Sequence, residues 1–97
     1  MQKLKILSYN IHGLENKRTY VDFFQYIKTC DIFALLETHI SDEKIESFTK
    51  FFGGYDLIWI PAERNSKFGR GIGGCCVGVK NCIKNKNFQY SFHKEKK

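Results

Sequence analysis

Short apolar runs alternate with helix-like spacing along this chain. Residues 3–9 (KLKILSY) and 31–37 (DIFALLE) are rich in apolar side chains, a pattern typical of strands buried in a sheet. Between them, residues 18–29 carry apolar side chains three and four positions apart, which predicts an amphipathic helix. Strand, helix and strand in this order predict a right-handed βαβ unit whose two strands are parallel.

The remainder of the chain predicts a second helix and three more strands. Ser41 is placed to cap that helix, Ile45, Phe48 and Phe52 share one of its sides, and two consecutive glycines end it before residue 55. Residues 56–60 (DLIWI) and 74–80 (GCCVGVK) are apolar runs, and residues 88–93 (FQYSFH) alternate aromatic with polar side chains. We therefore expect an α/β fold.

The composition is that of a globular domain, either small and complete or part of a larger one. Of the 97 residues, 42% are hydrophobic and 15% aromatic, with a single proline, so extended disorder is not expected. The formal net charge of +6 favours contact with a polyanion, most commonly nucleic acid. A basic chain without such a partner is the alternative that charge alone leaves open.

The cysteines and the amino-terminal residues indicate where in the cell the protein is expected. Cys30, Cys75, Cys76 and Cys82 show no CxxC spacing, and we interpret them as reduced thiols of an intracellular protein, in the nucleus or the cytoplasm. The start of the chain has neither the apolar core nor the cleavage site of a signal peptide. The sequence has no run near the roughly 20 apolar residues of a membrane span, so contact with a membrane is not expected.

Polar side chains stand at the ends of the first two predicted strands. Asn10 follows the first run, and Glu37 ends the second. The carboxyl ends of parallel strands form the edge where ligands bind in open α/β sheets. A carboxylate with a neighbouring amide oxygen suits a hard cation such as Mg²⁺. On these residues alone, a glutamate that is solvated or caps the strand is the competing interpretation.

Residues 69–74 (GRGIGG) satisfy the pattern G-x-G-x-x-G letter for letter. That pattern marks a dinucleotide site where it follows a strand and opens a helix, whereas here it follows a loop and opens a strand. We therefore expect no small-molecule cofactor, and a loop that needs positive φ and close approach of the backbone. Arg70 in this loop is free to contact a phosphate; a purely structural turn is the alternative.

The three histidines, His12, His39 and His93, are scattered along the chain. His39 comes two residues after Glu37, so the two side chains would share a face of an extended chain and could bind a metal together. The alternative is a surface histidine in a loop. The histidines are not accompanied by an acid that would mark one of them as a general base.

Three segments in order resemble a known family. LSYNIHGL (7–14), DIFALLETHI (31–40) and GRGIGGCCVGVK (69–80) are similar to the first three blocks of the endonuclease/exonuclease/phosphatase superfamily. The most similar branch is the apurinic-like endonuclease domain at the start of non-LTR retrotransposon polyproteins. The resemblance extends from about Lys3 to Lys80, and one departure is Leu36, where the family often has glutamine.

The resemblance implies a two-sheet α/β sandwich that hydrolyses phosphodiesters, here of DNA, with Mg²⁺ (or Mn²⁺). It places Asn10 in the catalytic centre, where it orients the metal and the phosphate, and makes Glu37 a metal ligand. The family's domain continues well past residue 97, with a catalytic tyrosine, an Asp-x-Asn block and a Ser-Asp-His block that carries the general base. The resemblance therefore implies a single partial domain over residues 1–97, lacking its carboxy-terminal half and inactive alone.

Two other functions stay open at this point. One is a small basic module that binds nucleic acid through the lysines of residues 80–97, with Phe88, Tyr90 and Phe92 as a stacking face. The other is a degenerate remnant with no activity. The oligomeric state is not predicted by the sequence.

Overall fold

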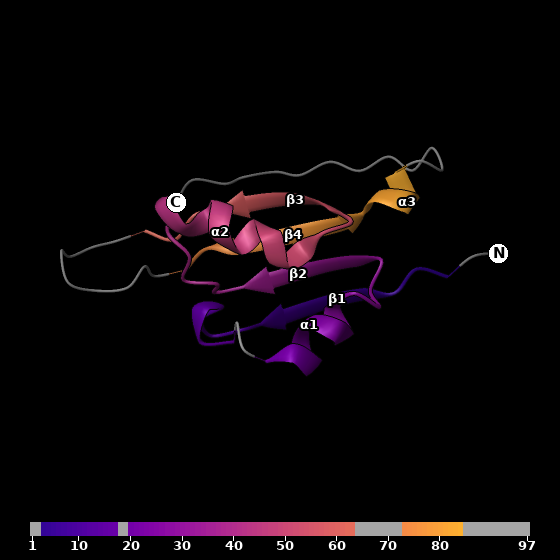
Figure 1. Cartoon of the computed structure of the whole chain (residues 1–97), viewed down its shortest axis with the longest axis horizontal. Coiled ribbons are helices and arrows are strands. Elements are labelled where there is room, and N and C mark those ends of the chain that lie inside the picture. Colours follow the sequence, from indigo (N-terminus) through magenta and orange to yellow (C-terminus); the bar gives the residue numbers. More distant parts are fainter. Residues whose placement is uncertain (1–2, 18–19, 64–72, 85–97) are drawn as a thin grey trace.

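The computed structural model describes residues 3–17, 20–63 and 73–84 (Figure 1). This part of the chain forms one mixed sheet with short helices. The strands are β1 (Ile6–Asn10), β2 (Ile32–Leu36), β3 (Tyr55–Ile60) and β4 (Cys75–Lys80). The helices are α1 (Val21–Ile27), α2 (Ile45–Thr49) and α3 (Asn81–Lys84), and single 3₁₀ turns are η1 (Glu15–Lys17), η2 (Asp42–Lys44) and η3 (Lys50–Phe52).

The strand order in the sheet is β1-β2-β4-β3. β1 and β2 are parallel, with Asn10 opposite Leu36, so the predicted βαβ unit is confirmed. β4 is antiparallel to both of its neighbours, so β1, β2 and β3 all run the same way. Their carboxyl ends and the start of β4 therefore lie at one edge of the sheet, on the left of Figure 1.

The second helix differs from its prediction. The apolar spacing is present, but the segment is divided into η2, α2 and η3. Ser41 stands at the N-cap position of η2, as predicted, but its side chain makes no hydrogen bond to the helix backbone. The chain then turns at Gly53 and Gly54 into β3. The strand predicted over residues 88–93 lies outside the described residues.

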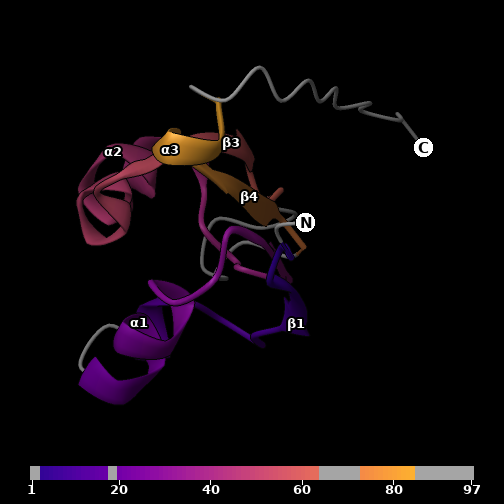
Figure 2. The ribbon, with the colours of Figure 1, turned by 90° about the vertical axis from the view of Figure 1, so that its right-hand side faces the viewer.

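The core lies between one face of the sheet and the helices. α1 and α2 sit on the same side of the sheet (Figure 2). The buried core side chains include Ile27, Phe48 and Phe52 from the helical segments and Phe33, Leu35 and Cys76 from the strands. The ring of Phe33 contacts both Phe52 and Tyr55, at centroid distances of 5.2 and 5.1 Å. Apolar burial on this face is the main stabilising term of the domain.

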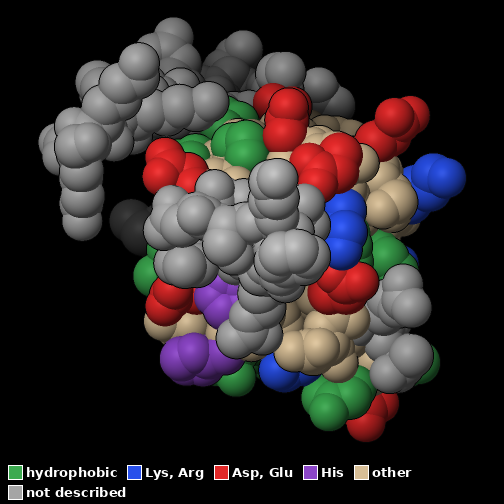
Figure 3. Space-filling view, turned by 90° about the vertical axis from the view of Figure 1, so that its left-hand side faces the viewer, with side chains coloured by type: hydrophobic (Ala, Val, Ile, Leu, Met, Phe, Trp, Pro, Cys, Tyr) green, Lys and Arg blue, Asp and Glu red, His purple; other side chains and the backbone are tan. Residues whose placement is uncertain are grey.

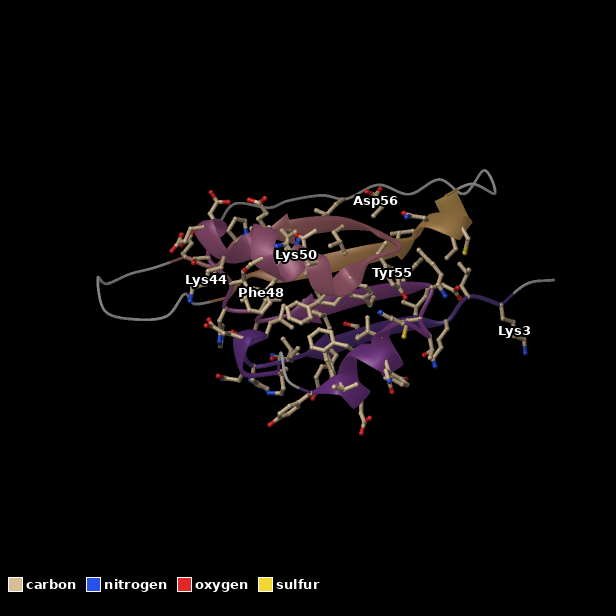
Figure 4. All side chains as sticks on the ribbon, viewed as in Figure 1. Lys3, Lys44, Phe48, Lys50, Tyr55 and Asp56 are labelled. Carbon is tan, nitrogen blue, oxygen red and sulfur yellow. The ribbon has the colours of Figure 1, made fainter. Side chains whose placement is uncertain are left out.

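The hydroxyl of Tyr55 links the start of β3 to the last residue of α1, Ile27, and to Cys30 shortly after it. The hydroxyl oxygen lies 2.9 Å from the carbonyl oxygen of Ile27 and 2.5 Å from that of Cys30, and its one proton serves both acceptors. Figure 4 shows Tyr55 reaching from the sheet toward the helices. Burial of the phenol, with the nearby side chains of Cys30 and Asp31, raises the pKa of Tyr55 to about 12.

The other face of the sheet carries apolar side chains that stay accessible. The strand register puts Ile6, Leu36 and Ile60 on this face, and they are 65%, 43% and 36% exposed. Between them lie Ile32, Ile58 and Val77, which are half-buried. A sheet face of this composition is one that a second layer would cover in a larger protein.

We expect Gly78→Ala to destabilise the domain. A Cβ at Gly78 would overlap the ring of Phe33 and lie 3.1 Å from Leu57, and both neighbours are held by core packing. Overpacking of this kind costs about 1–3 kcal/mol, measurable as a lower midpoint in urea unfolding. Gly53→Ala is the matched control, because nothing lies within 4 Å of its Cβ. Equal midpoints for the two variants would contradict this packing.

We expect Tyr55→Phe to lower stability by about 1 kcal/mol at neutral pH, since two carbonyl groups lose their shared donor. The pKa of Tyr55 is raised from 10.0 to about 12, so its contribution is complete below pH 10 and is lost as the pH rises through 12. Denaturant unfolding of both proteins should show their difference shrinking between pH 10 and 12. A constant difference would show that the phenol proton is not involved.

Candidate functional site

Backbone pairing at the edge of the sheet continues beyond the ends of β1 and β2. The amide of Ile11 donates to the carbonyl oxygen of Leu36, Gly13 to that of Glu37, and Leu14 to that of Thr38, each at 2.9 Å. Segments 11–14 and 36–38 therefore lie side by side. Asn10 and Glu37, which the sequence analysis singled out, thus stand at neighbouring strand ends, as the parallel pairing predicted.

Asn10 is the last residue of β1 and is exposed. Its Oδ1 accepts a hydrogen bond from the backbone amide of His12, at 3.2 Å. This local bond is typical of asparagine in turns, and it fixes the direction of the amide oxygen. The following residues turn across the end of the strand, and Ile11 and Leu14 are buried there.

Three residues at this edge have a left-handed backbone although none is glycine. The φ angles are 53° at His12, 55° at Glu37 and 57° at His39. For residues with a Cβ, this conformation costs roughly 1–2 kcal/mol each and persists where the surrounding structure enforces it. Such residues cluster at functional sites, so the backbone alone marks this edge of the sheet.

The start of β4 and the end of β3 hold the segment after β2 in place. The amide of Thr38 donates to the carbonyl oxygen of Gly74 at 3.1 Å, and that of His39 to Gly73 at 2.9 Å. The amide of Ala62 donates to the carbonyl oxygen of Ile40 at 2.8 Å. Gly73 and Gly74 have φ angles of 80° and 84°, so the positive φ predicted for this loop is present at its described end.

Thr38 is a positioning residue that the sequence analysis missed. Its side chain is fully buried, and its Oγ1 accepts a hydrogen bond from the amide of Ile40 at 3.4 Å. A Cβ at Gly74 would lie 2.9 Å from that Oγ1, so the glycine is what allows the two backbones to approach. In the sequence, Thr38 is one of two polar residues between Glu37 and the apolar Ile40, so no pattern singles it out.

Glu37 and His39 face one another across this turn. The Nε2 of His39 is 3.7 Å from the Oε1 of Glu37, and the side chains are 13% and 43% exposed. The second ring nitrogen of His39, Nδ1, is buried and has no hydrogen-bond partner among the described residues. The pair predicted from the i, i+2 spacing is therefore brought together, but by a left-handed turn and not by an extended strand.

The described part of this edge is acidic, although the whole chain is basic. Acidic and histidine side chains gather on the face that Figure 3 shows. The acidic residues in the segments that form this edge are Glu15, Glu37, Asp42, Glu43 and Glu63. Lys44 pairs with Glu15 at 3.0 Å. A surface of this charge attracts cations and repels phosphates.

Described lysines gather at the opposite edge. Lys5 donates through Nζ to Thr29, and Lys80 to the carbonyl oxygen of Lys28. Figure 4 shows Lys3 at the end of the molecule away from Lys44. Asp31 and Asp56 also lie at this edge, so the lysines there are interspersed with acidic side chains.

Candidate metal ligands at the carboxyl edge are few. Within residues 3–17, 20–63 and 73–84, no group of three or more His, Cys, Asp or Glu side chains could hold a metal ion. Glu37 and Asn10 supply hard oxygen donors at adjacent strand ends, and the left-handed turn presents the Glu37 carboxylate half-exposed. This donor set fits an ion such as Mg²⁺ that keeps several of its waters.

Other predicted residues fall where the structure gives no description. Arg70 lies outside the described residues, as do His93 and the proposed stacking face of Phe88, Tyr90 and Phe92. His12 is described, is exposed, and lies at the same edge as Glu37.

Comparisons with known proteins agree with the fold that the resemblance implied. No protein-family model and no curated protein sequence matches the chain. Among solved structures, the chain is similar to the catalytic domain of APE2 from Xenopus laevis, with 23% identity and a TM-score of 0.59, covering 79% of this chain and 23% of that one. The AP endonuclease LMAP from Leishmania major gives 21% identity and a TM-score of 0.60, covering 82% and 25%.

A third similar structure is the 3′ phosphatase NExo from Neisseria, solved bound to a product DNA hairpin. It is 17% identical with a TM-score of 0.57, and the match covers 79% of this chain and 27% of that one. The chain therefore has the α/β fold of these enzymes and spans about a quarter of their length. In the part of the chain that is described, none of the helices has the length and apolarity needed to cross a bilayer.

We expect Gly74→Ala to disturb the turn that carries Glu37. The new Cβ would crowd Thr38 Oγ1 and lie 3.0 Å from the amide nitrogen of Ala62, at a φ of 84°. Strain and overpacking together should lower stability by about 2–4 kcal/mol and shift the amide resonances of residues 37–39. Gly54→Ala is the control, because its φ is 89° but nothing lies within 4 Å. An equal loss in both variants would show that crowding at Thr38 is unimportant.

Proposed function

We propose that this chain is the amino-terminal part of a divalent-metal-dependent DNA endonuclease domain, of the type found in non-LTR retrotransposon polyproteins. The observation that supports it most is the position of Asn10 and Glu37 at adjacent ends of a parallel strand pair, in a fold shared with AP endonucleases. The retrotransposon type is proposed from the three sequence segments at residues 7–14, 31–40 and 69–80.

In this proposal, Glu37 and Asn10 hold one Mg²⁺ or Mn²⁺ ion at the edge of the sheet. Asn10 presents an amide oxygen whose direction is set by the His12 amide, and Glu37 presents a carboxylate on a turn fixed by Gly73 and Gly74. When bound, the ion would polarise the phosphodiester and stabilise the charge that develops on its oxygens. Arg70 is proposed to contact a neighbouring phosphate.

The acidic edge supports a metal-dependent reaction in particular. Without a cation, the carboxylates there would repel a DNA backbone. A divalent ion on Glu37 would reverse the local charge at the point where the phosphate must lie. Binding of a phosphate at this site therefore depends on the bound cation.

We further propose that the 97-residue chain alone is inactive. The resemblance assigns the general base and a second acid to later blocks of the family, and general-base catalysis is typically worth about 10²–10⁴-fold. The accessible apolar face of the sheet, with Ile6, Leu36 and Ile60, supports this, because a further layer of protein would cover it. The nucleotide sequence after the codon for Lys97 tests the proposal: Asp-x-Asn and Ser-Asp-His blocks in any frame would support it, and their absence would contradict it.

In a longer protein that contains this chain and those blocks, we expect Glu37→Gln to reduce nicking of supercoiled plasmid DNA about 100-fold or more with Mg²⁺. The reason is that the metal supplies several kcal/mol of transition-state stabilisation. Glu15→Gln is the control, since Glu15 belongs to the same acidic edge and pairs with Lys44. Undiminished nicking by the Glu37 variant would remove this residue from the site.

A further inference from the structure

The imidazole of His39 has no role in the proposed function, yet it lies beside the carboxylate to which that function assigns the metal. Its Nε2 faces Oε1 of Glu37 at 3.7 Å. The side chain is only 13% exposed, and its backbone amide is held by the carbonyl oxygen of Gly73 at 2.9 Å. The ring is therefore largely buried beside Glu37, and the backbone that carries it is held by a hydrogen bond.

The distance between Nε2 of His39 and Oε1 of Glu37 shows how these two side chains can interact. At 3.7 Å the two atoms are too far apart for a hydrogen bond. Two atoms that bind the same ion at about 2.0–2.2 Å, with angles between right-angled and tetrahedral, lie roughly 2.8–3.6 Å apart. A movement of a few tenths of an ångström, within reach of the half-exposed Glu37 side chain, would bring the pair to that separation.

We propose that Nε2 of His39 binds the same divalent cation as Glu37, and that this nitrogen ligand makes the site favour a first-row transition ion such as Mn²⁺ over Mg²⁺. The inference rests on the proposed function, because it takes Glu37 as a metal ligand. It departs from a site built of oxygen alone, which suits Mg²⁺.

The preference follows from the ligand chemistry. Mg²⁺ binds carboxylates, phosphates and water, and gains little from an imidazole. First-row transition ions accept imidazole readily, and their affinity for a nitrogen-containing site rises from Mn²⁺ to Co²⁺ and Ni²⁺. A buried, pre-positioned histidine beside a carboxylate should therefore raise the affinity for these ions selectively.

Pulsed electron paramagnetic resonance of Mn²⁺ bound to the 97-residue chain tests for a directly bound imidazole nitrogen. We expect nitrogen modulation in the natural chain, a changed pattern when its histidines carry the heavy nitrogen isotope, and no such modulation in His39→Gln. His12→Gln is the matched control, because His12 is an exposed histidine at the same edge, and it should keep the signal.

Calorimetric titrations give a second readout. We expect His39→Gln to weaken Mn²⁺ binding at least tenfold while Mg²⁺ affinity changes less than about twofold. If His39→Gln fails to fold by circular dichroism, a nitrogen signal that persists in both His12→Gln and His93→Gln still assigns the imidazole to His39, the third histidine of the chain.

The possible outcomes separate the role of His39 from the assignment of Glu37 as a metal ligand. Mn²⁺ binding that depends on Glu37 but shows no histidine nitrogen would overturn the role of His39 and leave the proposed function standing. A nitrogen signal that disappears in His12→Gln would also overturn it. Mn²⁺ binding that is unchanged in Glu37→Gln, or absent from the natural chain, would overturn this inference together with the assignment of Glu37.

Discussion

The pairing of β1 with β2 continues past the last residues of both strands, and the candidate site depends on that continuation. Hydrogen bonds from Ile11, Gly13 and Leu14 to the segment 36–38 keep two loops in register after the sheet has ended. Loops that leave a sheet usually diverge, and here they do not. Asn10 and Glu37 are neighbours because Asn10 pairs with Leu36 at the end of the parallel ladder, and the further hydrogen bonds keep the residues that follow side by side.

The sequence alone predicted the elements that depend on the local pattern of apolar residues. The run 31–37 predicted a strand buried on both faces; Phe33 and Leu35 are fully buried in β2, whereas Leu36 on the other face is 43% exposed. The parallel direction of β1 and β2 followed from the helix between them. The second helix was predicted less well, since the apolar spacing placed Phe48 and Phe52 correctly in the core but could not show that the helix would break into 3₁₀ turns.

The sequence predicted only part of the candidate site. Polar residues at strand ends pointed to Asn10 and Glu37, because their position follows from the strands that precede them. The left-handed backbone of Glu37 has no local signal, since glutamate does not favour it, whereas histidine adopts it more often than most residue types. It is imposed by hydrogen bonds from a segment more than thirty residues further along, at Gly73 and Gly74. For the same reason the importance of Thr38 appears only in three dimensions.

β1 is bonded to a single neighbouring strand in the described sheet, whereas β2 lies between two. An outer strand held from one side opens by local fluctuation far more often than the whole domain unfolds. Asn10 stands on that outer strand and Glu37 beside the inner one, so fraying of the margin would separate them while the aromatic core stays intact. The time for which Asn10 and Glu37 stay together is therefore set by the pairing of β1 with β2 and not by the global stability of the fold.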